Sequence, residues 1–141
     1  MAIQFTAHEV KDQLKDKRKL KQFLSDLFTA EGQGLKSLHY VFCTDAYLLE
    51  INKQFLQHDT YTDIVTFEMG EDPEVTEGEI YLSVDRVTEN AEKFGVPFNH
   101  ELHRVIFHGA LHLCGFKDKS KKEAALMRSK EEEYLNKYFG K

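Results

Sequence analysis

Residues 99–118 form the stretch NHELHRVIFHGALHLCGFKD. Its apolar residues recur every three or four positions, which is the spacing of one face of an α-helix. Asn99 is a favoured residue at a helix N-terminus, and Gly115 allows the left-handed turn in which many helices end. The sequence therefore predicts a helix between these two residues. Its apolar residues are Leu102, Val105, Ile106, Ala110 and Leu113.

Strands and helices alternate along the residues before this helix. β-Favouring residues predict strands at 3–5, 35–44, 64–67 and 79–84. Helical spacing of apolar residues predicts helices at about 16–31, 46–56 and 85–94. Further along, Ser120 and Glu123 have the spacing of a capping box, which predicts a last helix that runs to about Phe139. Residues 6–15 fit no element clearly, because a similar pattern at Thr6 is followed by few apolar residues.

These elements predict one compact domain of the α+β or α/β class over residues 1–141. The strands on either side of the acidic turn at 70–73 are expected to form a hairpin or to lie next to each other.

The composition excludes several classes of protein. A chain of 141 residues with 41% hydrophobic residues can bury a core, which argues against disorder. A net charge of -5 argues against coating nucleic acid by bulk electrostatics, so any contact with RNA must be local. No apolar stretch approaches the roughly 20 residues of a membrane span, and the first residues lack the pattern of an export signal. We therefore expect a cytoplasmic protein in which Cys43 and Cys114 are reduced.

Two histidines on the predicted helix are candidate metal ligands. His108 and His112 are four residues apart, so both imidazole rings project from one face and can share a cation. A glycine three residues later lets the chain turn back, and Asp118 stands where a third ligand would arrive. Metzincin peptidases have this spacing, with a third histidine in place of the aspartate. They also have a glutamate base directly after the first histidine, where this chain has Gly109, so a peptidase is disfavoured.

Residues 108–118, HGALHLCGFKD, resemble the signature HGxLHLxGYDH of the YbeY family of bacterial ribosomal RNA maturation factors. Segments upstream resemble the family in the same order. Ile51-Asn52 and residues 62–67, TDIVTF, are similar to its LN and TDVLSF segments. Gly78-Glu79-Ile80 is similar to its GDI. The resemblance extends from about Leu35 to the C-terminus.

The resemblance implies a compact α+β fold, with a mostly parallel or mixed sheet of about four strands surrounded by helices. The function that it implies is that of a metal-dependent, single-strand-specific endoribonuclease that acts in 16S ribosomal RNA 3′-end maturation and ribosome quality control. A zincin-like helix would carry a zinc-type site formed by His108, His112 and Asp118, with a fourth position open to water. The implied partners are single-stranded or ribosomal RNA and the small ribosomal subunit, with no membrane. Two alternatives stay open: a non-catalytic ribosome assembly factor with a structural metal and, ranked lower, a metallopeptidase.

Two positions depart from the family pattern. Asp118 replaces the family's third histidine, and because a carboxylate is a harder ligand, other divalent ions become candidates beside zinc. Leu56 replaces a common arginine, which removes a cation expected near the active groove. Neighbours such as His58, Lys117 or Lys119 could supply that charge instead.

Three further residues are candidates for substrate binding or catalysis. Lys117 and Lys119 flank the expected metal site and could contact phosphate groups. Asp63 stands at the start of a predicted strand. It would either cap that strand or turn, or act in catalysis or substrate positioning.

Overall fold

A mixed four-stranded sheet organises residues 2–56 and 62–140, the part of the chain that the computed structural model describes. The spatial order of the strands is β1-β2-β4-β3, in which β1, β2 and β4 are parallel and β3 is antiparallel to β4. The α+β class and the expected hairpin are therefore confirmed. The strands are β1 (Ile3–Ala7), β2 (Gly34–Cys43), β3 (Ile64–Glu68) and β4 (Val75–Ser83).

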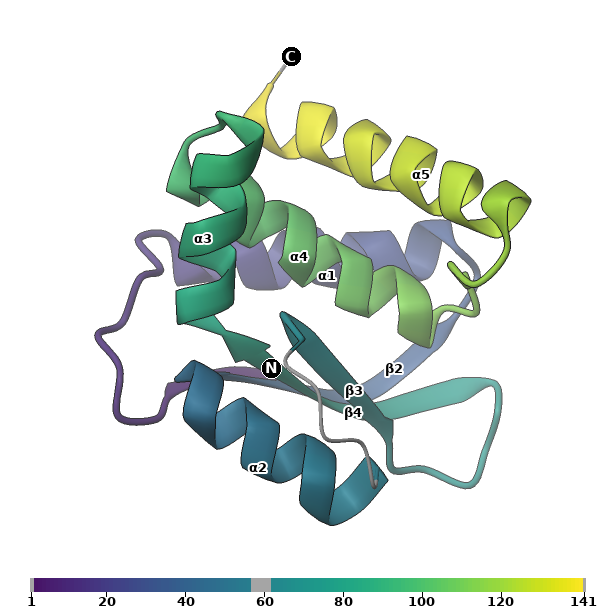
Figure 1. The fold of residues 1–141 in the computed structure, drawn as a ribbon. Coiled ribbons are helices and arrows are strands. Elements are labelled where there is room, and N and C mark those ends of the chain that lie inside the picture. Colours follow the sequence, from purple (N-terminus) through teal and green to yellow (C-terminus); the bar gives the residue numbers. More distant parts are fainter. Residues whose placement is uncertain (1, 57–61, 141) are drawn as a thin grey trace.

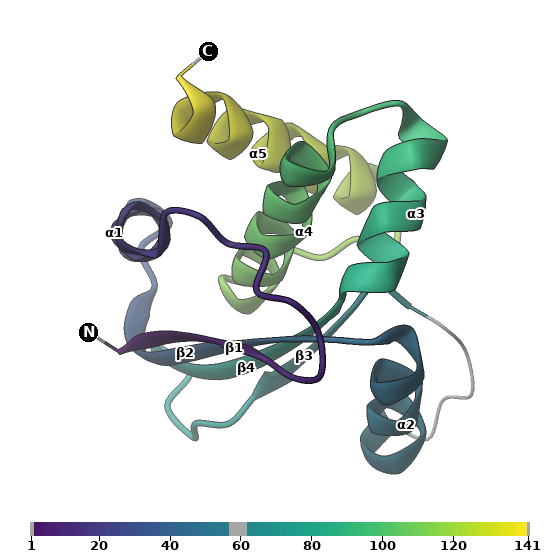
Figure 2. The ribbon, with the colours of Figure 1, turned by 90° about the vertical axis from the view of Figure 1, so that its left-hand side faces the viewer.

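Helices cover both faces of this sheet. Figure 1 shows α2 on one side and α1, α3 and α4 on the other, with α5 lying across α4. The edge-on view in Figure 2 shows the same layers and places α4 between the sheet and α5. Among the described residues, none of the helices could cross a membrane. The helices are α1 (Lys17–Ala30), α2 (Asp45–Leu56), α3 (Val84–Phe94), α4 (Phe98–Leu113) and α5 (Lys121–Phe139).

The main core lies between the sheet and α4. Successive side chains of a strand point to opposite faces, so alternate residues of β2, such as Leu38 and Tyr40, are buried on this side. The Tyr40 hydroxyl donates a hydrogen bond of 2.8 Å to the carbonyl oxygen of Ile106, which joins β2 to α4. On the other face, Cys43 and Val65 pack in a smaller cluster with residues of α2.

Most helix ends agree with the sequence-based predictions. At the start of α2, the Thr44 hydroxyl accepts a hydrogen bond of 3.1 Å from the backbone N–H of Tyr47. The capping box formed by Ser120 and Glu123 is present at the start of α5. Gly115 has a φ of 104°, which is the left-handed turn expected after α4. These ends were predictable because each depends on contacts within a few residues.

Three predicted boundaries are wrong. Asn99 does not cap α4, because the carbonyl oxygen of Pro97 already accepts bonds from the first helical turn and the helix begins at Phe98. Val84 begins α3 instead of ending β4, since the Ser83 hydroxyl caps that helix. β4 also begins earlier than expected, at residue 75, because it pairs with the start of β2. Residues 6–15, for which the sequence predicted no clear element, contain the end of β1 and no helix.

Close packing of α4 on the sheet depends on Gly109. A Cβ atom at this position would lie 2.9 Å from Cδ1 of Ile64 and 3.0 Å from Cδ1 of Ile80. Both distances are shorter than ordinary contacts between carbon atoms, which are about 3.5–4.0 Å. Any side chain at position 109 would have to displace the ends of both isoleucines, so the glutamate base of a peptidase would disturb this packing.

We expect Gly109→Ala to lower the free energy of unfolding by about 1 kcal/mol. Overpacking a core costs roughly 1–3 kcal/mol, and alanine recovers up to about 1 kcal/mol of helix propensity. Urea denaturation measures the change. Ile80→Val removes the Cδ1 atom that the new methyl group would meet, so the double variant should lose less stability than the two single variants added together. Additive losses would contradict this packing explanation.

Candidate active site

Three parts of the fold, α4, α5 and the loop between them, bring charged side chains together. Arg104 and His108 are one helical turn apart on α4, while Glu131 comes from α5 and Asp118 from the loop between the two helices. They surround a cavity of about 210 Å³. The residues lining it are Arg104, His108, Asp118, Ala124, Met127, Arg128 and Glu131.

The imidazole ring of His108 lies between two carboxylates. Its Nδ1 atom is 2.6 Å from Oε2 of Glu131, and its Nε2 atom is 3.5 Å from Oδ2 of Asp118. Burial lowers the pKa of His108, but the hydrogen bond to Glu131 and the nearby negative charges outweigh burial and raise it overall. Burial raises the pKa of Glu131, yet His108 and Arg104 lower it by more, so this side chain is a carboxylate. A carboxylate only accepts, so Nδ1 of the ring donates.

Arg104 joins three of the carboxylates near His108. Its Nε and Nη2 atoms donate to the two oxygens of Glu101, at 2.9 and 2.7 Å, and Nη1 donates to Oε1 of Glu131 at 3.0 Å. Nη2 also lies 4.0 Å from Oδ2 of Asp63. Burial lowers the pKa of Arg104, but the hydrogen bonds and charges of these glutamates raise it overall. The guanidinium therefore stays charged and compensates the two glutamates, which are 1% and 3% exposed.

The three candidate metal ligands lie at one end of α4. Burial and the charge of His108 lower the pKa of His112, which favours the neutral ring that a metal needs. Asp118 is half-exposed, with its carboxylate toward His108. Within residues 2–56 and 62–140, no three His, Cys, Asp or Glu side chains already form a metal-binding cluster. The donor types fit a divalent ion, but completing the set requires side chains to move.

Asp63 lies beside this network, at the start of β3. Burial raises the pKa of its carboxyl group, although the charges of Arg104 and His108 act in the opposite direction. Its backbone carbonyl accepts a hydrogen bond of 2.9 Å from Ser83, which belongs to the sheet. The geometry fits both interpretations of Asp63, as a cap at the start of the strand and as a residue that faces the site.

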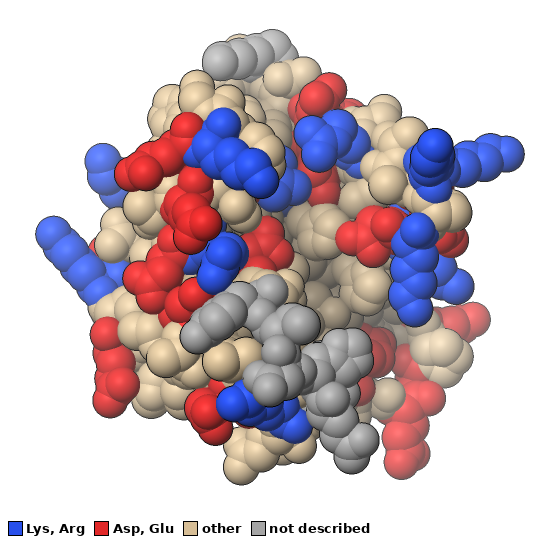
Figure 3. Space-filling view, in the orientation of Figure 1, with Lys and Arg blue, Asp and Glu red and all other residues tan. Residues whose placement is uncertain are grey.

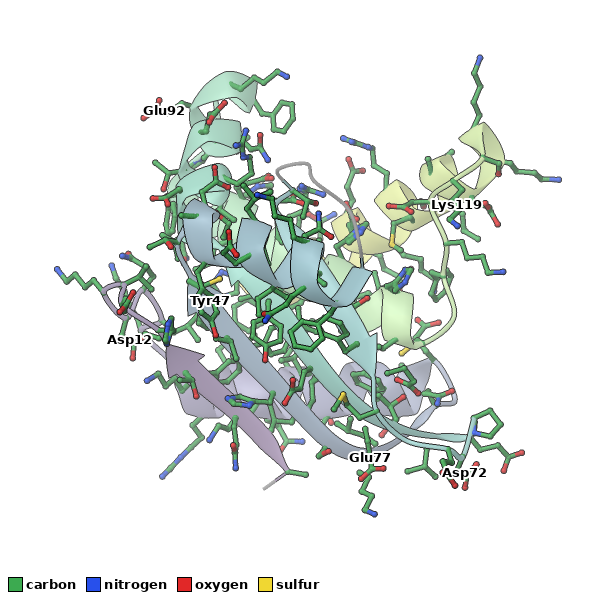
Figure 4. The ribbon with its side chains drawn as sticks, turned by 60° about the horizontal axis from the view of Figure 1, so that its bottom comes forward. Asp12, Tyr47, Asp72, Glu77, Glu92 and Lys119 are labelled. Atoms are coloured by element: carbon green, nitrogen blue, oxygen red, sulfur yellow. The ribbon has the colours of Figure 1, made fainter. Side chains whose placement is uncertain are left out.

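The candidate substrate-binding lysines are exposed. Figure 4 shows Lys119 on the connection that leads into α5, and its charge helps to lower the pKa of His112. Lys117 lines a different hollow with Phe116 and Glu123. Leu56 ends α2, and His58 lies outside the described residues.

The surroundings of Cys114 do not favour a role as a metal ligand. Its side chain is partly buried against the main core, and burial raises the pKa of the thiol to about 12. A thiol with this pKa stays protonated at neutral pH, whereas metals bind the thiolate. Both cysteines are free, as expected from the sequence.

Sequence reasoning missed Arg104, Arg128 and Glu131. A signal for Glu131 was present, because it is a charged residue on the buried face of α5, between Met127 and Leu135. Charged side chains are rarely buried without a partner, so such a position is a sign of a polar network. No comparable signal distinguished the two arginines from other surface cations.

Charges of both signs are interspersed over the face drawn in Figure 3. Acidic and basic side chains alternate there, and the described residues form no continuous basic surface on this face. This agrees with the net charge of -5. Contact with a nucleic acid would therefore depend on a few local cations.

The fold is similar to a solved structure over almost the whole chain. The solution structure of a Thermotoga maritima protein matches with a TM-score of 0.69 and 31% sequence identity. The match covers 98% of this chain and 89% of that one. The two proteins share one α+β architecture.

Sequence comparisons identify the family. The family model for endoribonuclease YbeY matches residues 3–139. A Flavobacterium psychrophilum protein of that name is 44% identical over 91% of this chain and 91% of its own length. Another, from Cytophaga hutchinsonii, is 42% identical over 95% of this chain and 94% of its own length. The chain belongs to the endoribonuclease YbeY family, which confirms the resemblance seen in residues 108–118 and the enzyme class that it implied.

Proposed function

We propose that this endoribonuclease depends on a divalent ion and cleaves single-stranded RNA during maturation of the small ribosomal subunit in the cytoplasm. One observation carries the proposal: His108 donates from Nδ1 to Glu131 and keeps Nε2 toward Asp118, at the edge of a cavity. This is how a histidine is held when its other nitrogen binds a metal. The names of the relatives in two bacteria support RNA as the substrate.

The residues of the site would have separate roles in metal binding and catalysis. His108, His112 and Asp118 would hold the ion, with zinc as the first candidate and other divalent ions favoured by the carboxylate. A divalent ion supplies a water of lowered pKa and offsets negative charge on a phosphodiester. Asp63, which lies 4.0 Å from Arg104, is the candidate catalytic carboxylate.

Exposed cations at the cavity are candidates for binding the RNA backbone. Arg128 lines the cavity and forms no ion pair within the described part of the chain, so its guanidinium is free to meet a phosphate. Lys119 stands on the loop that carries Asp118, and Lys117 is close in sequence but lines another hollow. Arg128 would supply the positive charge that is lost where Leu56 replaces the arginine common in the family.

Two alternatives make different predictions. A peptidase of this spacing needs a carboxylate at position 109, where this chain has a glycine packed against the side chains of Ile64 and Ile80. A non-catalytic assembly factor would hold a structural metal in a closed site, and its binding to the small subunit would survive without any RNA cleavage.

Purified protein is expected to contain close to one divalent ion per chain, measured by elemental analysis. The double variant His108→Ala, His112→Ala should lose most of this metal, because two of the three ligands are gone. His39→Ala is the matched control, since it removes an imidazole from β2 outside the cavity. Unchanged metal content in the double variant would show that the ligands lie elsewhere.

Asp118→His is expected to raise the affinity for zinc relative to manganese, because an imidazole is a softer ligand than a carboxylate. The side chain is 46% exposed, so the variant should fold. A competition titration between the two ions measures the ratio of affinities. If the ratio does not change, Asp118 does not contact the ion.

The protein is expected to cleave unstructured RNA, and a chelator or His112→Ala should abolish the activity. Arg128→Ala should raise KM for RNA and leave the metal content unchanged, whereas Arg18→Ala, an exposed arginine on α1, should have little effect on either. Casein serves as the control substrate. Chelator-sensitive cleavage of casein with RNA left intact would favour the peptidase, and metal binding without any cleavage would favour the assembly factor.

A further inference from the structure

We infer that Glu131 is a positioning residue, which fixes the ring of His108 so that Nδ1 is held in a hydrogen bond and Nε2 is left toward Asp118. The inference rests on the proposed metal site, because it concerns how His108 is presented to an ion. Glu131 belongs to α5 and is separated from His108 by 23 positions in the sequence.

The contacts of Glu131 leave its carboxylate little freedom. Oε2 accepts from Nδ1 of His108 at 2.6 Å, and Oε1 accepts from Nη1 of Arg104 at 3.0 Å. Glu101 holds the other edge of the guanidinium through two hydrogen bonds. Rotation of the carboxylate would break at least one charge-assisted bond inside the protein, so the orientation of the ring is set by the whole network.

Packing alone does not explain an acidic residue at this position. Glu131 lies on the buried face of α5 between the apolar residues Met127 and Leu135. A buried ion pair is weak evidence for a role in stability, because replacing a whole pair by apolar residues is often neutral or stabilising. The carboxylate does what an apolar side chain cannot, because it accepts a hydrogen bond from one chosen nitrogen of the imidazole.

The hydrogen-bond pattern predicts which nitrogen of His108 carries the proton in the neutral ring. Long-range ¹H–¹⁵N correlation spectra of the metal-free wild type, at a pH where the ring is neutral, should show the Nδ1–H tautomer. This measurement needs neither a variant nor bound metal. A predominant Nε2–H tautomer would overturn the inference.

Glu131→Gln tests the same role through metal affinity. A glutamine has one acceptor and one donor end, so it can satisfy either Arg104 or the Nδ1–H group of His108, but not both. Zinc affinity, measured by competition with a chromophoric chelator, is expected to fall by about 10–100-fold. The matched control is Glu132→Gln, which removes the same charge from an exposed position on α5 and should bind zinc as the wild type does.

The outcomes separate this inference from the proposed function. If the wild type binds no zinc, the metal site itself is wrong. If the wild type binds zinc and Glu131→Gln binds it equally well, only the role of Glu131 is wrong. An equal loss in both variants would indicate a general effect of charge and would also overturn the inference. If Glu131→Gln does not fold, as judged by circular dichroism, the tautomer of the wild type decides.

Discussion

Carboxylates cannot stay charged inside a protein without partners, and in this structure one arginine compensates two of them. Arg104 binds the buried side chains of Glu101 and Glu131, and the second of these also accepts from His108. Removing one partner of such a network typically lowers the free energy of unfolding by about 3–5 kcal/mol, because a buried charge is left without a partner. The same contacts join α5 to α4 and hold the ring of His108, which is a candidate metal ligand.

The position of α4 makes this arrangement possible. One face of the helix packs closely on the sheet at Gly109, where a side chain would meet Ile64 and Ile80. The histidines lie one and three residues away along the same helix, so the helix serves the core and the site at once. A peptidase with this ligand spacing uses the residue after the first histidine as its base. In this chain that position is part of the core, which leaves proton transfer to another group such as Asp63.

The charge distribution favours a substrate that is held locally. The acidic protein has interspersed charges on the face of Figure 3, so long-range attraction of RNA is weak. Arg104 is engaged by carboxylates, whereas Arg128 lines the same cavity without an ion pair among the described residues. These two arginines therefore differ in their surroundings: carboxylates hold Arg104, and Arg128 is the one that we propose for contact with a phosphate.

The sequence by itself determined the features that depend on neighbouring residues. The helix that carries His108 and His112, the turn at Gly115 and the capping box at Ser120 depend on local patterns, and these patterns predicted them correctly. The cap at Asn99 was predicted wrongly, because backbone bonds to Pro97 begin α4 before that residue. Only the tertiary structure decided which nitrogen of His108 faces Asp118 and which arginine at the cavity forms no ion pair with the described residues. These properties depend on α5 lying across α4, and no pattern within a single element records which side chains then come into contact.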